Sequence, residues 1–359
     1  MTDSSDDDRD DDDDRDLSLE LPPGADPAID WGQRSHLDAD GRPKIIERWL
    51  EVTPDLAGLR LDHFIKTQIP RLSRTKIQDV IASQLTGPRA VKASMAVVAG
   101  ERFVIRRPAR AEPPCPRTFG VVYEDARLLV VDKPAFLPVH ASAKFYFNTL
   151  ARVLSERYPD EPELQLCHRL DRETSGCLAI ARDRETASVV KGRIADKAVT
   201  TKDYLAVVHG VPPWSDTRAL DTPLRLSTAA DATLVPTVRV LPDPRGMAAT
   251  TLARVVRASA DGAYALISCT LVTGRQHQIR VHLAHAGFPI VGDKLYAHGD
   301  DAFVAYCEHG LTAELAARFV LPRHALHAAR LAFPHPDGGG RVVDARAELP
   351  PDLARLVPP

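Results

Sequence analysis

The sequence predicts an α+β protein with a small N-terminal α/β module followed by a larger domain. Three observations support this fold class. Residues 60–107 combine two short amphipathic helices with strand-like segments, a proline-rich segment separates them from the rest, and later apolar runs typical of strands are followed by a well-delimited helix. At 359 residues and 44% hydrophobic composition, the chain is long enough to bury more than one core.

Composition excludes several classes of protein. No apolar run approaches the roughly 18 residues that a membrane span needs, so we expect no membrane association. The start, MTDSSDDD, is neither basic nor apolar, which argues against a secretory signal and for a cytoplasmic location. The five cysteines include no CxxC pair, so we expect buried, reduced thiols and neither disulfides nor a zinc site.

Charge is distributed unevenly along the chain. Residues 1–16 carry ten Asp and two Arg, a net charge of −8, whereas the whole chain carries −3 and the remainder therefore +5. Residues 60–107 alone carry +7, which points to a polyanionic partner. The acidic tail cannot bury apolar surface, and we expect disorder that continues loosely over residues 1–45.

Two helices are predicted next, in the module that we place at residues 46–107. Apolar residues from Leu61 to Ile69 follow helical spacing and end at Pro70. Ser73 is a good N-cap for the second helix. Arg74 and Lys76 occupy its first turn, which predicts either a docked phosphate or a solvated basic face. Short strands are expected between Val91 and Ile105, with a turn at Gly100.

The segments RLDHFIKTQIPRLSRTKIQDVI and VKASMAVVAGERFVI resemble the ribosomal-protein-S-four-like (alpha-L) RNA-binding module. The chain departs from that family at Gly87-Pro88-Arg89, where an Asn-Gly hairpin is usual. The resemblance implies that this module binds RNA. The basic residues that we assign to this contact are Arg60, Arg71, Arg74 and Lys76.

The proline-rich segment 108–118 is expected to be a stiff linker to a domain spanning residues 119–350. That domain begins with two strands, the first from Phe119 and the second over Leu128–Val131, joined by a turn at 124–127.

A polar loop, HRLDRETSG, lies between two apolar strand-like runs at 164–167 and 177–181. Asp171 stands in this loop between Arg169 and Arg172, and two cations beside a carboxylate lower its pKa and keep it ionised. An ionised carboxylate suits a nucleophile or an electrostatic stabiliser better than a general acid. Taken alone, an Asp beside arginines is more often a structural ion pair than a catalytic group.

Two later segments add candidate residues. Val199–Val208 alternates as a strand with Tyr204 on one face. Ala263–Leu271 predicts a strand that leads into Thr273-Gly274-Arg275-Gln276, which we interpret as a capping box for the helix HQIRVHLAHAG, ended by Gly287. On that helix His277 and Arg280 share one face, apart from the buried stripe.

Together HRLDRETSG, KDYLAVVHG and TGRQHQIRVHLAHAGFPIVGDKLY resemble the RluA-type pseudouridine synthases, and the likeness extends from about Phe119 to Pro336. The chain departs from that pattern at Phe136, where Gly is common, and at Ala297, near an insertion that runs to about residue 320. The resemblance implies a mixed, largely antiparallel central sheet with flanking helices, and isomerisation of uridine to pseudouridine in RNA. It also implies that Asp171 is the catalytic carboxylate, by nucleophilic attack on the sugar or by proton abstraction, that Arg280 pairs with it, and that Tyr204 lies against the base. The reaction is redox-neutral, so no cofactor is expected.

Further roles follow from position beside these three residues. A uridine in folded RNA must be flipped out to reach a buried carboxylate, and Arg169 is a candidate to fill the gap that it leaves. His168, Arg275 and His277 are expected to bind substrate. His277, His282 and His285 have poor spacing for zinc, so we expect no metal and interpret them as helix-surface and phosphate contacts.

The expected substrate is large-subunit ribosomal RNA, with transfer RNA as the alternative, and the expected state is a monomer. Two other functions stay open. A non-catalytic RNA-binding factor would need only the basic module. A nucleoside glycosylase would also use carboxylates at a sugar carbon, although a second, water-activating carboxylate is not evident in the three segments.

Overall fold

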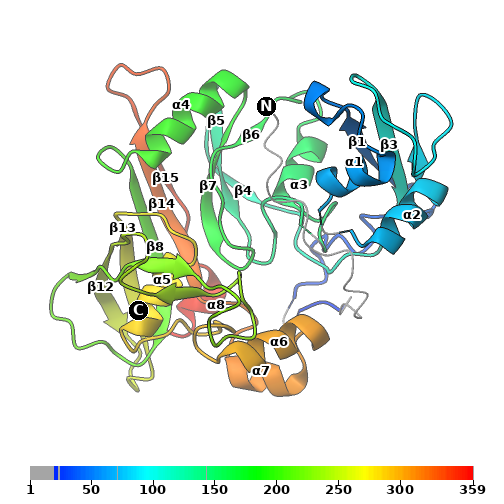
Figure 1. Cartoon of the computed structure of the whole chain (residues 1–359). Helices are drawn as coiled ribbons and strands as arrows, with labels where there is room; N and C mark the ends of the chain where they lie inside the picture. The colour runs from blue at the N-terminus through cyan, green and yellow to red at the C-terminus, as the bar shows by residue number, and fades with distance from the viewer. Residues whose placement is uncertain (1–19, 23–24, 71, 143, 359) are drawn as a thin grey trace. The chain divides into compact units, whose positions relative to one another are not determined.

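The computed structural model describes residues 20–22, 25–70, 72–142 and 144–358, and Figure 1 labels their helices and strands. Contacts divide the chain into two units. Among the described residues, the first comprises 32–113 and 141–148, and the second comprises those before residue 32 together with 114–140 and 149–358. The acidic stretch 1–16, with its expected disorder, lies outside the described residues.

The first unit is built on a three-stranded antiparallel sheet in the order β1-β3-β2. Its core joins the apolar faces of both helices to the sheet through residues such as Phe64, Ile77 and Phe103. The elements are β1 (Ile45–Glu51), a 3-10 turn (Pro54–Leu56), α1 (Leu61–Gln68), α2 (Arg74–Ser83), β2 (Leu85–Thr86) and β3 (Arg102–Pro108).

Both predicted helices of this unit are confirmed. α1 ends at Gln68, two residues before Pro70, and Ser73 caps α2 by accepting a hydrogen bond from the Lys76 amide at 3.2 Å. The strands expected from residue 91 are wrong before Arg102. Residues 93–97 instead place their carbonyls against the start of α1, where Met95 O accepts from the Leu61 amide at 2.8 Å.

Two expected boundaries also need correction. Residues 25–45 are not a loose tail, because Trp31 is buried, turns follow it, and β1 begins at Ile45. Segment 141–148, expected in the larger domain, groups with the first unit: the buried Glu112 carboxylate accepts from the amides of Phe147 and Asn148. Within the proline-rich segment, the Cys115 amide donates to Trp31 O at 3.0 Å.

The second unit is organised around a ten-stranded sheet in the order β4-β5-β7-β14-β8-β13-β12-β9, with β15 on β14 and β6 on β7. The described strand pairs are antiparallel except for β7 with β14, which confirms the mixed, largely antiparallel sheet. The strands are β4 (Gly120–Glu124), β5 (Leu128–Lys133), β6 (Gln165–Leu166), β7 (Ser175–Ala181), β8 (Thr201–His209), β9 (Arg218–Leu220), β12 (Thr251–Ala258), β13 (Tyr264–Leu271), β14 (Leu326–Pro334) and β15 (Val342–Arg346), and a separate hairpin joins β10 (Leu224–Leu226) to β11 (Val240–Pro242).

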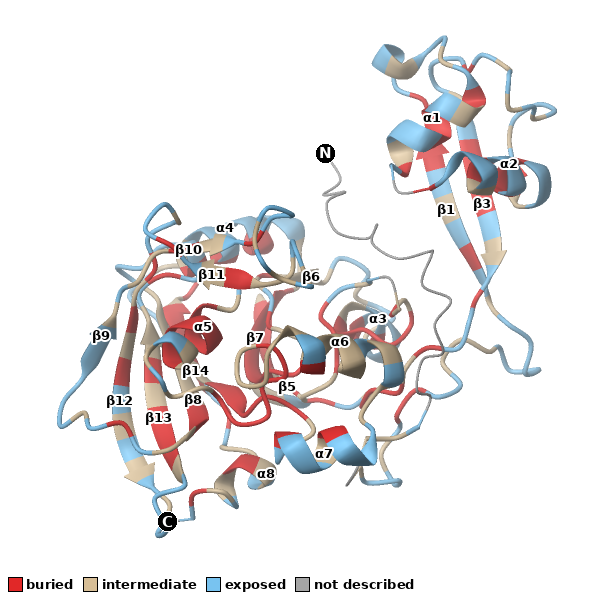
Figure 2. Ribbon diagram, turned by 60° about the horizontal axis from the view of Figure 1, so that its bottom comes forward, coloured by how far each residue is buried: buried red, intermediate tan, exposed pale blue. Residues whose placement is uncertain are grey.

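Helices pack on both faces of this sheet, and Figure 2 colours the buried positions along it. α3 (Leu150–Arg157) packs on the face of β5 and β7 that carries Leu129 and Leu178, whereas α4 (Arg184–Ala195) packs on the opposite face. α5 (Gln278–His285) packs on β8 and β13. The other helices are α6 (Asp300–His309), α7 (Ala313–Phe319) and α8 (Pro351–Ala354).

Three predicted details of this unit are wrong. The capping box does not form: α5 begins at Gln278, and Gln278 Oε1 reaches back to accept from the Arg275 amide at 3.0 Å. His282 is buried, 2% exposed, rather than on the helix surface, because its ring contacts the Thr251 hydroxyl and Thr222 O. Cys307 is exposed, although the other four cysteines are buried.

Candidate active site

The loop that carries Asp171 joins β6 to β7 and is fixed at its far end by the sheet. Thr174 and Ser175 contact the rings of His324 and His327, which precede or begin β14. Gly176 has φ +112°, and a Cβ there would lie 2.2 Å from Ala328 O, so glycine permits the close parallel pairing of β7 with β14. The loop therefore starts from a rigid position.

A buried lysine holds the middle of the same loop. Lys133, at the end of β5, is fully buried and donates to Pro134 O, Leu137 O and Arg172 O at 2.8, 2.9 and 3.2 Å. Its three donors match three carbonyls, as the ammonium group requires when buried. Burial and the nearby Arg323 guanidinium lower the pKa of Lys133 to about 7.

Arg280 places Asp171 by bridging it to a second carboxylate. Its Nη1 donates to Asp171 Oδ2 at 3.1 Å, while Nε and Nη2 donate to the two oxygens of Asp293 at 2.6 and 3.0 Å. Asp293 is fully buried, whereas the Asp171 side chain is 34% exposed. Asp293 thus anchors one edge of the Arg280 guanidinium. The remaining nitrogen bonds Asp171, which of the two carboxylates is the one that solvent or a substrate can reach.

The electrostatics of this pair keep Asp171 ionised. Burial by itself would raise the pKa of Asp171, but His277 and Arg280 more than offset it and the pKa is lowered to about 2. Burial and Arg280 lower the pKa of His277 to about 4, so at neutral pH the positive charge beside Asp171 is that of Arg280. A permanently ionised carboxylate can attack an electrophilic carbon or accept a proton, and it is a poor general acid.

His277 lies beside the pair because its backbone is left-handed, with φ 53° at the residue before α5. Its Nδ1 is 2.9 Å from the Tyr296 hydroxyl and its Nε2 is 3.9 Å from Asp171 Oδ2. The Tyr296 ring in turn packs on the Arg280 guanidinium, 4.9 Å from its Cζ. Tyr296 therefore supports two neighbours of Asp171.

Tyr204, on β8, is half-buried and packs against the clusters on both sides of it. Burial, and then the negative charge of Asp171, raise its pKa above the usual value. The phenol near Asp171 therefore stays protonated at neutral pH.

The other predicted site residues lie in different surroundings. Arg169 is exposed in the loop, and the His168 ring turns back to the sheet, where Nε2 accepts from the Ala179 amide at 3.1 Å. Arg275 donates to Ala248 O at 3.2 Å before α5. His168 is therefore engaged in holding the loop, which does not favour its predicted role in substrate binding.

In the first unit the predicted RNA contacts lie at the start of its helices. Arg60 donates with two nitrogens to Asp62, at 3.1 and 2.8 Å, so its charge is partly balanced. Arg74 is exposed and Lys76 half-buried at the start of α2. Arg71 lies outside the described residues. The predicted phosphate contact at α2 stays a prediction.

Sequence reasoning missed the buried charges that surround Asp171. Besides Lys133 and Asp293, the loop residue Glu173 is buried and accepts from Lys294 Nζ at 2.7 Å. Burial would raise the pKa of Glu173, but Lys294 and His324 outweigh it and the pKa is lowered to about 2. The signal available was a charged residue inside an apolar segment, as in LLVVDKP and FPIVGDKLY.

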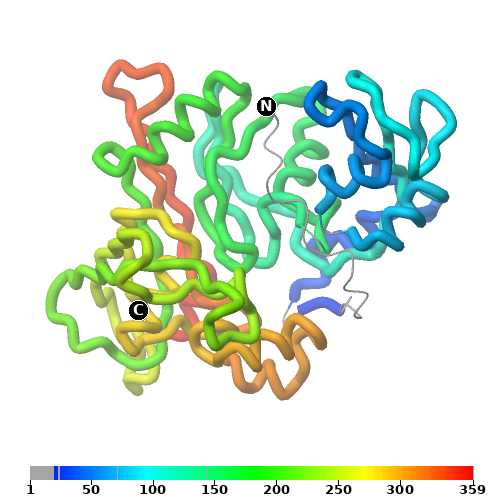
Figure 3. Tube along the Cα trace, in the orientation of Figure 1, coloured from blue at the N-terminus to red at the C-terminus, as the bar shows by residue number. Residues whose placement is uncertain are grey.

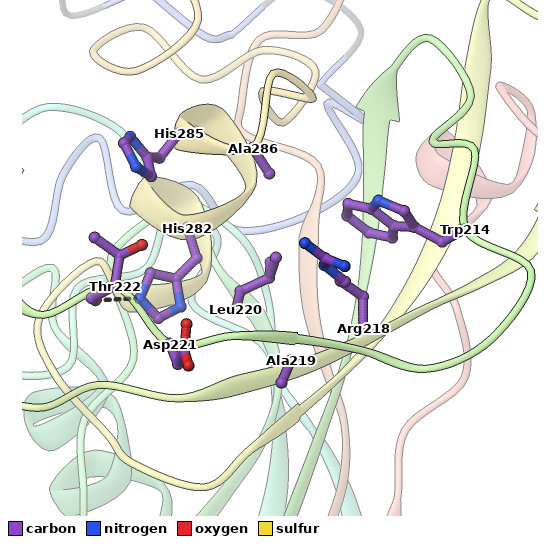
Figure 4. A pocket seen from close by; sticks show the side chains of 9 residues that line it. All are labelled: Trp214, Arg218, Ala219, Leu220, Asp221, Thr222, His282, His285 and Ala286. Carbon is purple, nitrogen blue, oxygen red and sulfur yellow. Dashed lines mark hydrogen bonds between the residues drawn. The ribbon is translucent and has the colours of Figure 1, made fainter.

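A surface hollow of about 260 Å³ lies elsewhere, beside the C-terminal half of α5 (Figure 4). It contains none of the predicted catalytic residues, although His282 and His285, which were interpreted as surface and phosphate contacts, line it. Its lining is Trp214, Arg218, Ala219, Leu220, Asp221, Thr222, His282, His285 and Ala286. We therefore place the candidate active site at Asp171 and the charged residues around it, and not at this hollow. In the part of the chain that the structure describes, no group of three His, Cys, Asp or Glu residues is arranged to hold a metal ion.

The sheet, together with the ion pairs of Arg280 with Asp171 and Asp293, holds an ionised carboxylate on a rigid loop. Residues 127–285 match the family described as RNA pseudouridylate synthase. Ribosomal large subunit pseudouridine synthase D of Zymomonas mobilis is 32% identical over 326 residues, covering 85% of this chain and 95% of that protein. Ribosomal large subunit pseudouridine synthase C of Escherichia coli is 31% identical, covering 85% and 94%.

The chain belongs to the RNA pseudouridylate synthase family, which confirms the resemblance found in the sequence. Among solved structures, human RNA pseudouridylate synthase domain containing 4 aligns with a TM-score of 0.50 at 27% identity, covering 66% of this chain and 92% of that one. Human RNA pseudouridylate synthase domain containing 1, at 22% identity and a TM-score of 0.51, supports the fold alone. Within the described residues, the longest helices fall short of what crossing a membrane would take.

Proposed function

We propose that this chain isomerises uridines in large-subunit ribosomal RNA, with Asp171 as the catalytic carboxylate, in the cytoplasm and as a monomer. The observation that carries the catalytic assignment is the Asp171–Arg280 contact of 3.1 Å, with Arg280 anchored on buried Asp293. The choice of ribosomal RNA follows the relatives that this chain matches over 85% of its length, which are named as ribosomal large subunit pseudouridine synthases.

The proposed chemistry begins at the sugar. Asp171, ionised and partly exposed, attacks the ribose or removes a proton from it, while Arg280 keeps the carboxylate oriented. The bond from ribose to the uracil nitrogen breaks, the base turns, and its carbon 5 forms a bond to the sugar. In the same step the bond from Asp171 to the sugar breaks or, in the other route, the proton that Asp171 removed returns to the sugar. The hydrogen on carbon 5 then leaves as a proton, in a step where Tyr204 is the proposed assistant. The released ring nitrogen takes up a proton in exchange, so the base keeps its composition and the reaction needs no oxidant or reductant.

We propose that two regions of the chain recognise the RNA. The basic residues Arg60, Arg74 and Lys76 of the first unit would contact phosphates, together with Arg71. Around the catalytic loop, Arg169, Arg275 and His277 would contact the flipped nucleotide and its neighbours. His168 is retained here only as support for the loop, given its contact with the Ala179 amide.

Release of tritium from RNA labelled at carbon 5 of uracil tests the function directly, because the new bond forms at that carbon. Transcripts of large-subunit ribosomal RNA and a pool of transfer RNA serve as rival substrates. We expect release from the ribosomal transcript only. Release from transfer RNA alone would favour the alternative substrate, binding without release would favour a non-catalytic factor, and free uracil would favour a glycosylase.

The variant Asp171→Asn tests the catalytic assignment. The amide keeps the size of the side chain but cannot act as a nucleophile or accept the proton, so we expect turnover to fall by at least about 10³-fold. RNA affinity in a filter-binding assay should stay within about two-fold. Turnover near that of the unmodified chain would contradict the role of Asp171.

A further inference from the structure

We propose that Tyr306, in the insertion that follows Tyr296, is a positioning residue for the catalytic loop. The inference rests on the proposed function, because it assumes that the loop carries the reactive carboxylate. Tyr306 belongs to α6, one of two short helices between residues 300 and 319, in the region where the chain departs from the family pattern.

The Tyr306 hydroxyl contacts both residues that follow Asp171. It accepts a hydrogen bond from Arg172 Nη2 at 2.8 Å, and it lies 3.4 Å from Glu173 Oε1, to which it donates. Arg172 Nη2 also donates to that Glu173 oxygen at 3.1 Å. One hydroxyl therefore closes a triangle with the two loop side chains, as a donor to one and an acceptor from the other.

The ring that carries this hydroxyl is itself fixed. Lys294 Nζ lies 4.8 Å from the centre of the Tyr306 ring, and the fully buried Phe319 of α7 packs edge-on against it at 6.4 Å. Lys294 also donates to Glu173 Oε2, so the same ammonium group supports both the tyrosine and the loop.

The helix is anchored at its other end as well. Asp300, in the first turn of α6, accepts from the Leu234 amide at 2.9 Å and contacts the side chains of Thr233 and Arg239. These residues belong to the connection between β10 and β11, which thereby ties α6 to the hairpin. Tyr306 thus projects from a helix held at both ends rather than from a free surface element.

These contacts complete a two-sided restraint on Asp171. Arg280, on α5, holds the Asp171 carboxylate. Tyr306, in the insertion, and Lys294 hold the side chains of the next two residues, Arg172 and Glu173. A displacement of the reacting atom by about 1 Å can cost about 10²-fold in rate even when the substrate still binds. The hydroxyl therefore affects the reaction through Arg172 and Glu173, without touching the substrate.

The test is Tyr306→Phe, which removes the hydroxyl and keeps the ring on Lys294. We expect the single-turnover rate on the tritiated ribosomal transcript to fall about ten-fold, with KM and RNA affinity within two-fold and the melting temperature little changed. The matched control is Tyr264→Phe on β13, a tyrosine whose ring contacts His209 and which lies outside the site; its rate should not change.

A double-mutant cycle separates positioning from general stability. If Tyr306 acts through Arg172, the double variant Tyr306→Phe with Arg172→Gln should be no slower than Arg172→Gln alone. Unchanged kcat in Tyr306→Phe, or fully multiplicative rate losses in the double variant, would overturn the inference while leaving the proposed function intact. No tritium release by the unmodified chain from either RNA would instead overturn the proposed function, and this inference with it.

Discussion

The guanidinium of Arg280 donates to Asp171 Oδ2 over 3.1 Å, although 109 residues separate the two in the sequence. Two other nitrogens of the same guanidinium donate to the buried Asp293 carboxylate, so one side chain bonds two carboxylates, one buried and one partly exposed. The buried carboxylate sets the orientation of the guanidinium, and the partly exposed one is left for chemistry.

Replacing Arg280 with Lys tests this bridge. A lysine keeps the charge but offers a single nitrogen, which cannot reproduce three directed hydrogen bonds to two carboxylates. We expect kcat to fall by about 10²-fold, with RNA affinity retained, and the folded state to lose about 2 kcal/mol because Asp293 keeps its burial and loses part of its pairing. Single-turnover kinetics and urea unfolding measure the two effects. A variant with normal kcat would show that Asp171 needs only a nearby charge.

The buried Glu173 gives the stability of the protein a defined dependence on pH. Its folded pKa, about 2, lies below its ordinary value of 4.5, so the unfolded chain binds more protons between these values. The stabilisation is therefore present above about pH 5 and is lost as the pH falls toward 2. We expect Glu173→Gln to be about 2 kcal/mol less stable at pH 7.

That difference should shrink as the pH falls, because the unmodified chain loses the same charge by protonation. Urea unfolding between pH 7 and pH 3 measures it, with the exposed pair Arg102–Glu51 as the control site: Glu51→Gln should change stability by less than about 1 kcal/mol at every pH. A Glu173→Gln penalty that is constant down to pH 3 would contradict the depressed pKa.

Local patterns predicted the elements whose apolar periodicity is uninterrupted. α1 and α2 in the first unit were found because each buries one regular face. β8 and β13 in the second unit were also found, although each buries consecutive residues rather than one alternating face. β1 was missed, since it directly follows polar residues that had been assigned to the tail. The predicted capping box was wrong because the side chain of Gln278, inside the helix, accepts the hydrogen bond from the Arg275 amide. Its contacts with Thr250 and Thr273 hold the Gln278 side chain in that position.

The site was predictable in part for the same reason. Asp171 stood out in a polar loop between strands, and Arg280 and Tyr204 came from the family resemblance. Asp293, Lys294 and Lys133 are sequence neighbours of apolar residues and pair with groups from distant elements, so their partners become visible only when the sheet is assembled. His282 shows the converse, since it was predicted at the surface and is enclosed by β12 and the segment before β10.

Arg169 provides a prediction about the substrate. If its side chain fills the gap left by a flipped uridine, removing it should matter only where that uridine starts inside a stacked structure. We expect Arg169→Ala to lower kcat/KM about ten-fold or more on a folded ribosomal transcript and less than two-fold on a flexible single strand. Equal losses on both RNAs would refute the role. Arg254→Ala, at an exposed position of β12 away from the loop, is the matched control.

Lys133 gives a prediction about the rigidity of the loop. Its Nζ donates to three carbonyls, and one of them, Arg172 O, belongs to the residue after Asp171. In Lys133→Met the apolar stem is kept and all three carbonyls, one buried and two partly buried, lose their donor. Each unpaired buried group costs about 1–3 kcal/mol, partly offset because an ammonium group no longer has to be buried, so we expect a net loss of about 2 kcal/mol in urea unfolding. Turnover of the folded fraction should fall more than RNA affinity, because the loop is free to move at Arg172. A variant as stable and as active as the unmodified chain would show that the loop holds its shape without Lys133.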